Sequence, residues 1–348
     1  MTWIKNLIAR TLLFSLIAVW TNAAFANSPL KVVVTIPPFH ALVSAVMGDI
    51  AKPQLLLKAG ASPHHYTLRP SEIKALQEAN LIFWGGPALE SFLIKPFTTL
   101  PKSVKIIEFD KTKSLLLLPV RRTTHFEACC DHEHENGDND KHSHSHTNSH
   151  THSHSHAHSN HNKNDHAHDH PIYDMHFWLD PNNAKLIIDE IATTLSKSDP
   201  EHARQYQENA KQFKLKLTAL DSELKKQLKP VQKIPFIVFH DAYQYFERHY
   251  NLSAAGSISL HPEIPPSVER LQEIRNIIQT TKAVCVFREP QFKSQLVTTL
   301  AQETGTHEGE LDPLGLPTKQ GGDGYLKLLK DLANAFVGCL GTKKPTQN

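Results

Sequence analysis

The chain has 348 residues, of which 40% are hydrophobic, and its 37 Lys/Arg and 35 Asp/Glu give a formal net charge of +2. This length is enough for two lobes that each bury a core of their own. The basic and acidic residues are nearly balanced and interspersed, so the composition does not favour a nucleic-acid partner and we expect none. Histidine is the unusual count, with 24 residues, of which 15 lie between positions 125 and 170.

The first residues have the pattern of an export signal. Lys5 and Arg10 supply positive charge, residues 11–20 (TLLFSLIAVW) are apolar, and residues 24–26 (AFA) match an A-x-A cleavage site. The alternative, a transmembrane anchor, needs about 20 apolar residues, roughly twice the length of this run. We therefore predict a signal peptide over residues 1–26 and a mature protein exported most simply into a bacterial periplasm.

From residue 31 the chain alternates β-branched apolar runs with helical patterns. Such an alternation predicts parallel βα units with helices on both faces of a sheet. The expected strands are 31–36 (KVVVTI), 54–59 (QLLLKA), 81–86 (LIFWGG) and 104–110 (VKIIEFD), and the expected helices are 39–49 and 69–79.

Residues 121–171 break this pattern, because they contain no Leu, Ile, Val or Met. A segment of this kind cannot bury enough apolar surface to offset its ordering entropy, so we expect a disordered His-rich loop. Its His-x-His repeats predict weak metal sites, and we expect them to collect zinc and raise its concentration near a tighter site. A solvated insertion without a zinc role and a zinc sensor are the alternatives. The expected weak ligands are His142, His144, His146, His150, His152, His154, His156 and His158.

The folded pattern returns at residues 173–181, followed by a helix over 182–197. A proline-initiated helix is then expected over 198–230, with one apolar stripe along it. The βα alternation restarts after it. The expected strands are 234–239, 283–290 and 306–313, and the expected helices are 242–250, 267–280, 291–305 and 325–340.

These patterns predict an α/β fold of two lobes. Each lobe has a parallel sheet flanked by helices, over residues 27–197 and 231–348, and the long rigid helix 198–230 joins them. Ligands of open α/β sheets gather beyond the carboxyl ends of the strands.

Metal-competent residues lie at several of these strand ends. His64 and His65 follow one strand, His176 lies where the order resumes, His240 ends a strand, and Asp312 lies in the last expected strand. Three imidazoles and one carboxylate suit Zn²⁺, although each residue taken alone is more often a cap or a satisfied core residue.

The four cysteines have different contexts. In an oxidising compartment Cys285 and Cys339 are plausible disulfide partners, and two separate buried thiols are the alternative. Cys129 and Cys130 are adjacent in the polar tract, and their state stays open.

Five motifs in this order resemble the solute-binding proteins of zinc ABC transporters, the group with a rigid interlobe helix. This resemblance covers the chain from about residue 30 to its end. In that family the motif histidines and aspartate bind the metal in the interlobe cleft, which implies His64, His176, His240 and Asp312 as ligands, and Cys285 and Cys339 match the family disulfide. The motifs are ASPHHYTLRPSE (61–72), DMHFWLDP (174–181), FHDAYQYFE (239–247), CVFREPQF (285–292) and LDPLG (311–315).

The resemblance implies a periplasmic protein that captures Zn²⁺ with high affinity and delivers it to an ABC importer of the inner membrane. The partners would be the permease and ATPase subunits, and the protein would act as a monomer without catalytic activity. The zinc branch of the family also carries a His-rich loop at the place of residues 121–171. One departure is Pro63, where some zinc-specific members have an acid, and the neighbouring His65 is an alternative ligand.

Three other functions compete with this one. Manganese-binding relatives have a carboxylate at the position of His240, and imidazole suits zinc better than manganese. A zinc-storage or adhesin role without a membrane transporter is a further alternative, because adhesins of this family share the same fold. An exported zinc hydrolase would need an open coordination position and a base, for which Asp241 and Glu263 are the candidates, but the chain has no H-E-x-x-H motif.

Overall fold

The computed structural model describes residues 30–58, 60–121, 123, 126, 173–259, 262–293, 295–315 and 321–342. The expected signal peptide and the eight histidines of the expected weak sites lie outside the described residues, as do Cys129 and Cys130. Within the described ranges, no helix has both the length and the apolar character needed to cross a membrane.

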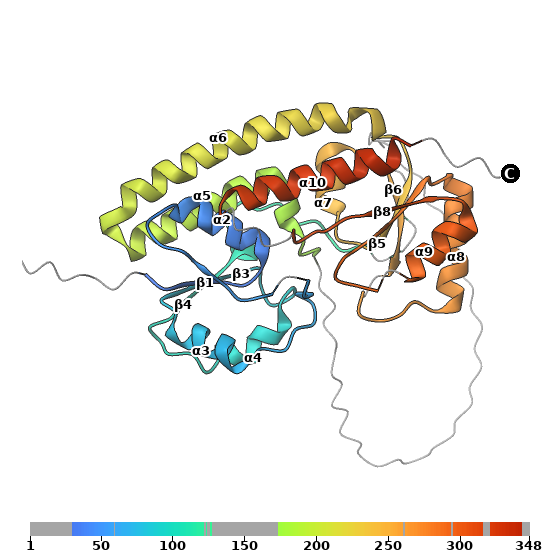
Figure 1. The fold of residues 1–348 in the computed structure, drawn as a ribbon. Coiled ribbons are helices and arrows are strands. Elements are labelled where there is room, and N and C mark those ends of the chain that lie inside the picture. The colour runs from blue at the N-terminus through green and yellow to red at the C-terminus, as the bar shows by residue number, and fades with distance from the viewer. Residues whose placement is uncertain are drawn as a thin grey trace, which may run out of the picture. The chain divides into compact units, whose positions relative to one another are not determined.

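The first half of the chain forms a four-stranded parallel sheet in the order β2-β1-β3-β4 (Figure 1). The valines of central strand β1 are all buried, as expected for a strand that is covered on both faces. This sheet therefore confirms the predicted βα pattern. Its elements are β1 (Val32–Val34), α2 (Pro37–Met47), β2 (Gln54–Leu55), α3 (Pro70–Glu78), β3 (Leu81–Trp84), η1 (Ser91–Leu93), α4 (Ile94–Phe97), β4 (Lys105–Glu108) and η2 (Phe109–Lys111).

The second half forms another four-stranded parallel sheet, in the order β6-β5-β7-β8. Because β5 has β6 on one side and β7 on the other, the chain changes direction across the sheet at the carboxyl end of β5. Its elements are β5 (Phe236–His240), α7 (Gln244–Tyr250), β6 (Ala254–Ser259), α8 (Val268–Thr281), β7 (Cys285–Arg288), α9 (Gln295–Thr304), β8 (His307–Glu310) and α10 (Asp323–Leu340).

Strand β6 is an element that the sequence pattern did not predict. Its residues, AAGSIS, are mostly small, and only Ile258 is β-branched. The strand nevertheless forms at the sheet edge because it pairs with β5, and five of its six residues are buried. Tertiary pairing therefore outweighs its weak intrinsic β-propensity.

The predicted long helix is present as α6 (Ala203–Leu228), which follows α5 (Pro181–Ser198). At 26 residues it is about 39 Å long. It is shorter than predicted because single 3-10 turns, η4 (Pro200–His202) and η5 (Lys229–Val231), stand at its two ends. Its apolar stripe packs on α2, α5 and α10. The predicted domain boundaries stay a prediction. The fully or nearly fully buried residues of this stripe are Tyr206, Ala210, Phe213, Leu217, Leu224 and Leu228.

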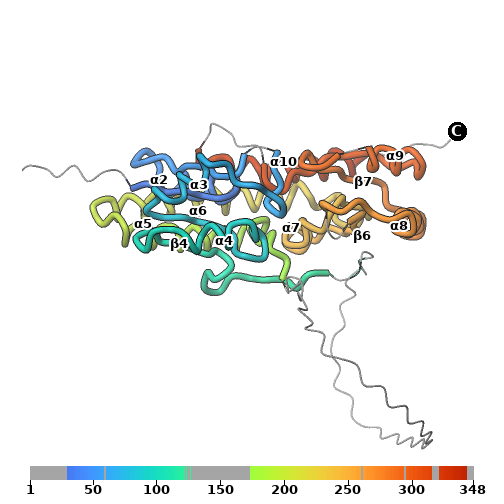
Figure 2. The backbone as a smooth tube through the Cα atoms, turned by 90° about the horizontal axis from the view of Figure 1, so that it is seen from below, coloured from blue at the N-terminus to red at the C-terminus, as the bar shows by residue number. Residues whose placement is uncertain are grey.

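Helix α10 is a second connection between the two halves. It packs on β8 of the second sheet, on α2 of the first half and on α6 (Figures 1 and 2). The predicted disulfide is confirmed: Cys339 of α10 is bonded to Cys285 of β7, with 6.1 Å between the Cα atoms. Helices α6 and α10 thus connect the two halves. The candidate ligands are to be sought at the carboxyl ends of the strands.

Candidate metal centre

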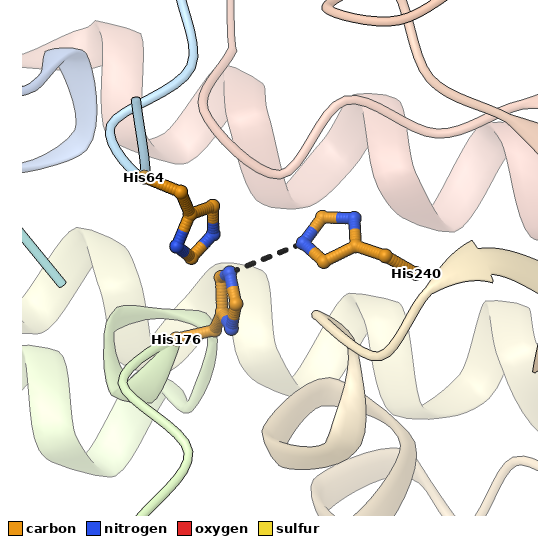
Figure 3. A group of neighbouring side chains, drawn as sticks. All are labelled: His64, His176 and His240. Carbon is orange, nitrogen blue, oxygen red and sulfur yellow. Dashed lines mark hydrogen bonds between the residues drawn. The ribbon is translucent and has the colours of Figure 1, made fainter. Parts of the chain in front are cut away.

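Three histidines converge from three separate segments of the chain (Figure 3). One nitrogen of each ring of His64, His176 and His240 lies within 4.8 Å of the corresponding nitrogens of the other two. His64 belongs to the loop after β2, His176 precedes the 3-10 helix η3 (Phe177–Leu179), and His240 is the last residue of β5. The structure therefore brings together all three histidines that the sequence predicted as ligands.

His176 is oriented by a carboxylate two residues earlier in the chain. One oxygen of Asp174 accepts hydrogen bonds from the backbone N–H of His176, at 2.9 Å, and from its ring Nδ1, at 2.7 Å. Tyr245 fixes Asp174 in turn by donating its hydroxyl to the Asp174 carbonyl at 2.6 Å. With the proton on Nδ1, the lone pair on Nε2 faces the other histidines.

His240 is oriented in the same way from the neighbouring strand. Its Nδ1 lies 2.6 Å from Oε1 of Glu289, the residue directly after β7, which pairs with β5. Both side chains are buried. Burial would lower the pKa of His240, but the Glu289 carboxylate opposes this, and the net effect is a pKa above its ordinary value. The site thus favours a positive charge at this ring.

The spacing of the rings suits a tetrahedral metal. The Nε2 atoms of His176 and His240 are 3.4 Å apart. With Zn–N bonds of 2.0–2.1 Å, two ligands of a tetrahedral zinc ion are about 3.4 Å apart. Two lone pairs at this distance repel each other unless a proton or a metal ion lies between them, so the pair is built to share a cation.

His64 lies at the open side of the site and is partly exposed. Its ring centroid is 5.3 Å from that of His176 and 5.7 Å from that of His240. Its backbone N–H donates to the Ser62 hydroxyl at 3.2 Å, and that hydroxyl donates to Glu263 of the other half at 3.0 Å. The loop that carries His64 is therefore held to the opposite lobe by an exposed hydrogen bond.

The fourth predicted ligand, Asp312, lies outside the group of three. Its Oδ1 accepts hydrogen bonds from Nε2 of Gln291 at 2.7 Å and from the backbone N–H of Leu314 at 3.0 Å. Both of these partners line the cavity that the histidines line, a space of about 230 Å³ including its mouth. Coordination by Asp312 stays a prediction. His65 is exposed and is not a member of the cluster.

A buried ion-pair network lies behind the site. Arg121 donates to Asp241 at 2.9 Å and to Glu247 at 2.8 Å, and its guanidinium lies 3.6 Å from the centre of the Phe126 ring. Burial raises the pKa of Glu247 to about 7 although Arg121 opposes this. Asp241, considered in the sequence as a catalytic base, is instead an ion-pair partner that lies next to His240.

Sequence reasoning missed the roles of Asp174, Glu289 and Gln291. The signal for Glu289 was available, because it lies at the carboxyl end of the predicted strand 283–290, where ligands were sought. Asp174 and Gln291 lie inside motifs that were quoted for the resemblance. Their contacts depend on the packing of the segments, which no spacing along the chain reveals.

Comparison with known proteins places these residues in a family. Residues 32–339 match the family described as zinc-uptake complex component A, periplasmic. The high-affinity zinc uptake system protein ZnuA of Brucella abortus (strain 2308) is 48% identical over 336 residues, which cover 97% of this chain and 99% of that protein. The protein of the same name from Paracoccus denitrificans (strain Pd 1222) is 45% identical over 312 residues, covering 89% and 92% of the two chains.

Solved structures share the fold. A crystal structure of ZnuA superposes with a TM-score of 0.69 at 23% identity and covers 90% of this chain and 99% of that chain. A structure of the laminin-binding protein Lmb of Streptococcus agalactiae has a TM-score of 0.66 at 23% identity, covering 89% and 99%. The match to a family of uptake components sets aside the hydrolase alternative, and by its residues 32–339 the chain belongs to the ZnuA family of periplasmic zinc-uptake complex components.

Proposed function

We propose that this protein captures Zn²⁺ in the periplasm with high affinity and delivers it to an ABC importer of the inner membrane. The observation that supports this most is the set of three converging imidazoles, two of which have their Nδ1 atoms on buried carboxylates. Nitrogen donors favour zinc over harder ions such as manganese. The three imidazoles therefore favour zinc over the manganese-binding alternative.

The metal ligands that we propose are His64, His176, His240 and Asp312. The first three supply neutral ring nitrogens, and Asp312 would supply the oxygen that is not already engaged by Gln291 and Leu314. Four protein donors, with one further position for a water in a five-coordinate shell, suit binding and transfer of an ion rather than catalysis on it.

The location and partners complete the proposal. Residues 1–26 act as a cleaved signal peptide, and the mature protein works as a monomer that docks on the permease, whose ATPase subunits drive transport. The helical ties between the lobes limit large closure, so we expect release of the ion to involve local shifts of the ligand loops. Loop 60–65, which carries His64, is the candidate because Ser62 and Glu263 hold it by an exposed contact.

Competitive zinc titration with a chelator of known affinity tests the binding proposal. The wild-type protein should bind one zinc ion tightly, and His176→Ala should weaken this binding by orders of magnitude because it removes one of four donors. His202→Ala is the matched control, since His202 pairs with Asp199 at the start of the long helix, away from the site. Equal zinc affinity in wild type and His176→Ala would refute the site.

Growth tests the transport part separately. A strain that lacks the gene should grow poorly when zinc is scarce and recover with added zinc or with the wild-type gene. The His176→Ala gene should fail to restore growth, and the His202→Ala gene should restore it. A deletion strain that grows normally without zinc would contradict an uptake role even if the purified protein binds zinc.

A further inference from the structure

Gln291 is a cavity-lining side chain that contacts Asp312 directly. The cavity is lined by the three histidines and by Gln291, and Asp312 is not among its lining residues. Gln291 lies two residues after Glu289, at the carboxyl end of β7, and Asp312 lies two residues after the end of the neighbouring strand β8. The adjacency of the two strands therefore brings the amide and the carboxylate together.

The hydrogen bond to Asp312 fixes which way the amide of Gln291 points. A carboxylate only accepts hydrogen bonds, so the amide group that lies 2.7 Å from Asp312 must be the NH₂. The other Asp312 contact, the backbone N–H of Leu314, engages the same oxygen. The Gln291 amide is thus held in a single orientation by a partner that is itself anchored.

The amide oxygen of Gln291, unlike its NH₂ group, has no hydrogen-bond partner among the described residues. It is also buried. Buried amide oxygens in native proteins nearly always have a donor, and an exception of this kind is often explained by a ligand or a water. A water molecule on a bound zinc ion is acidic and is therefore a strong donor.

Resting on the proposed zinc function, we propose that Gln291 is a positioning residue for the oxygen donors of the site. Its Nε2 holds Asp312, which presents its second oxygen to the metal, and its Oε1 accepts a hydrogen bond from a water carried by the ion. Gln291 and Asp312 then act as a unit, because each orients the other. The histidines provide the nitrogen donors, and this pair controls the oxygen donors and hence the coordination geometry.

Variants of Gln291 test this with two readouts, zinc affinity by chelator competition and the visible absorption spectrum of the Co²⁺-substituted protein. Gln291→Met has similar length but neither donor nor acceptor, so we expect zinc affinity to fall about 10–100-fold and the cobalt spectrum to change. Gln291→Glu keeps an acceptor but places an oxygen against Asp312, and it should also bind zinc more weakly. Gln272→Met, the same substitution at an exposed glutamine of α8, is the control and should leave both readouts near wild type.

A purely structural role for Gln291 predicts a different result. Gln291→Met would then lower the melting temperature while leaving the cobalt spectrum and the zinc affinity unchanged, and this outcome would overturn the proposal. A wild-type protein without a tight zinc site would instead overturn the proposed function itself. The two failures are therefore distinguishable in the same titrations.

A double-mutant cycle tests whether the two residues act as a unit. If they do, Gln291→Met/Asp312→Ala should weaken zinc binding by much less than the product of the two single fold-changes, because each variant already disables the pair. Fold-changes that multiply would show independent action and would overturn the proposal.

Discussion

Nδ1 of His240 lies 2.6 Å from Oε1 of Glu289, with only 4% and 3% of the two residues exposed. The carboxylate fixes the tautomer of the ring, directs Nε2 at His176 and adds negative charge next to the proposed metal position. Two neighbouring strand ends supply the pair, since β5 ends at His240 and Glu289 follows β7. The register of one sheet therefore sets both a proposed metal ligand and the group that orients it.

Replacing Glu289 by Gln tests this relationship. The amide can still accept from Nδ1, but the negative charge is lost, so we expect zinc affinity to fall about 10–100-fold. Chelator competition measures the effect. Glu308→Gln is the control, because Glu308 pairs with Arg288 on the exposed side of β8. Zinc affinity unchanged by Glu289→Gln would mean that the carboxylate only fills space.

The metal-free protein should also show a competition between protons and zinc. Burial lowers and Glu289 raises the pKa of His240, with a net value above its ordinary one. Zinc must displace that proton. When the pH is lowered, zinc affinity should therefore begin to fall while the pH is still above about 6.5. Glu289→Gln should move the onset to lower pH. Zinc titrations between pH 5.5 and 8 measure both curves, and coincident onsets would contradict the assignment.

The sequence predicted much of the fold because most strands are recognisable as runs of apolar residues such as Val32–Val34. It missed β6, whose AAGSIS residues become a strand only through pairing with β5. It also predicted the three histidines, although their wide spacing meant that a resemblance was needed to join them. It could not predict Glu289 as the partner of His240, because that contact depends on which strands are neighbours.

The Arg121 ion pairs should matter for stability. Arg121 lies between Asp241 and Glu247, with 21% of its side chain exposed and 12% and 6% of theirs. Arg121→Met would leave two buried carboxylates without a counter-charge, which costs about 3–5 kcal/mol of unfolding free energy. Denaturant unfolding measures this. Arg275→Met is the control, because Arg275 pairs with the exposed Glu303 and should cost under about 1 kcal/mol.

A double variant separates the charge contribution of Arg121 from its packing contribution. Removing a carboxylate together with the arginine, as in Arg121→Met/Glu247→Gln, leaves less uncompensated charge and should recover part of the lost stability. A double variant as unstable as the sum of its parts would show that packing of the Arg121 stem, rather than charge, is the main contribution.

His249 should make stability depend on pH. Its ring lies between Asp180 at the start of α5, at 3.3 Å, and Asp221 of α6, at 2.7 Å, and all three side chains are under 10% exposed. Burial lowers the pKa of His249, but hydrogen bonds to the two carboxylates raise it above the ordinary value. Its stabilisation is therefore fully present below about pH 6.5 and is lost as the pH rises through the folded-state pKa.

The comparison of wild type with His249→Gln isolates this effect. The difference in melting temperature should be largest at pH 6 and should shrink toward pH 9. His202→Gln, at a more exposed pair with Asp199, should give a small difference at every pH. A difference between wild type and His249→Gln that stays constant with pH would show that the ring acts only by packing.

The disulfide should stabilise the folded state. It closes an interval of 54 residues between Cys285 and Cys339, which the chain-entropy treatment values at roughly 4 kcal/mol. Cys339→Ser should therefore unfold at a lower temperature under oxidising conditions. Reduction should destabilise the wild type and leave the variant unaffected. Equal melting temperatures for the two oxidised proteins would contradict a stabilising role.

The final prediction concerns the His-rich tract, whose central residues lie outside the described ones. Its flanks are anchored: the backbone N–H of Phe126 donates to Ala255 at 3.0 Å, and Tyr173 forms a bridge with Pro119. A deletion of residues 128–170, closed with a short Gly/Ser linker, would keep these anchors. We expect calorimetry to show one tight zinc site in both proteins and several weak sites only in the full-length chain, because all four proposed ligands lie outside the deletion.

The same two proteins test whether the tract delivers zinc to the tight site. If the repeats collect zinc, the full-length chain should load its tight site faster at low zinc than the shortened chain, with equal affinity at equilibrium. His176→Ala in the shortened background should abolish the remaining tight site and so confirm where that site lies. Loss of the tight site on deletion alone would mean that the tract supplies a ligand, and the ligand set of three histidines and Asp312 would then be incomplete.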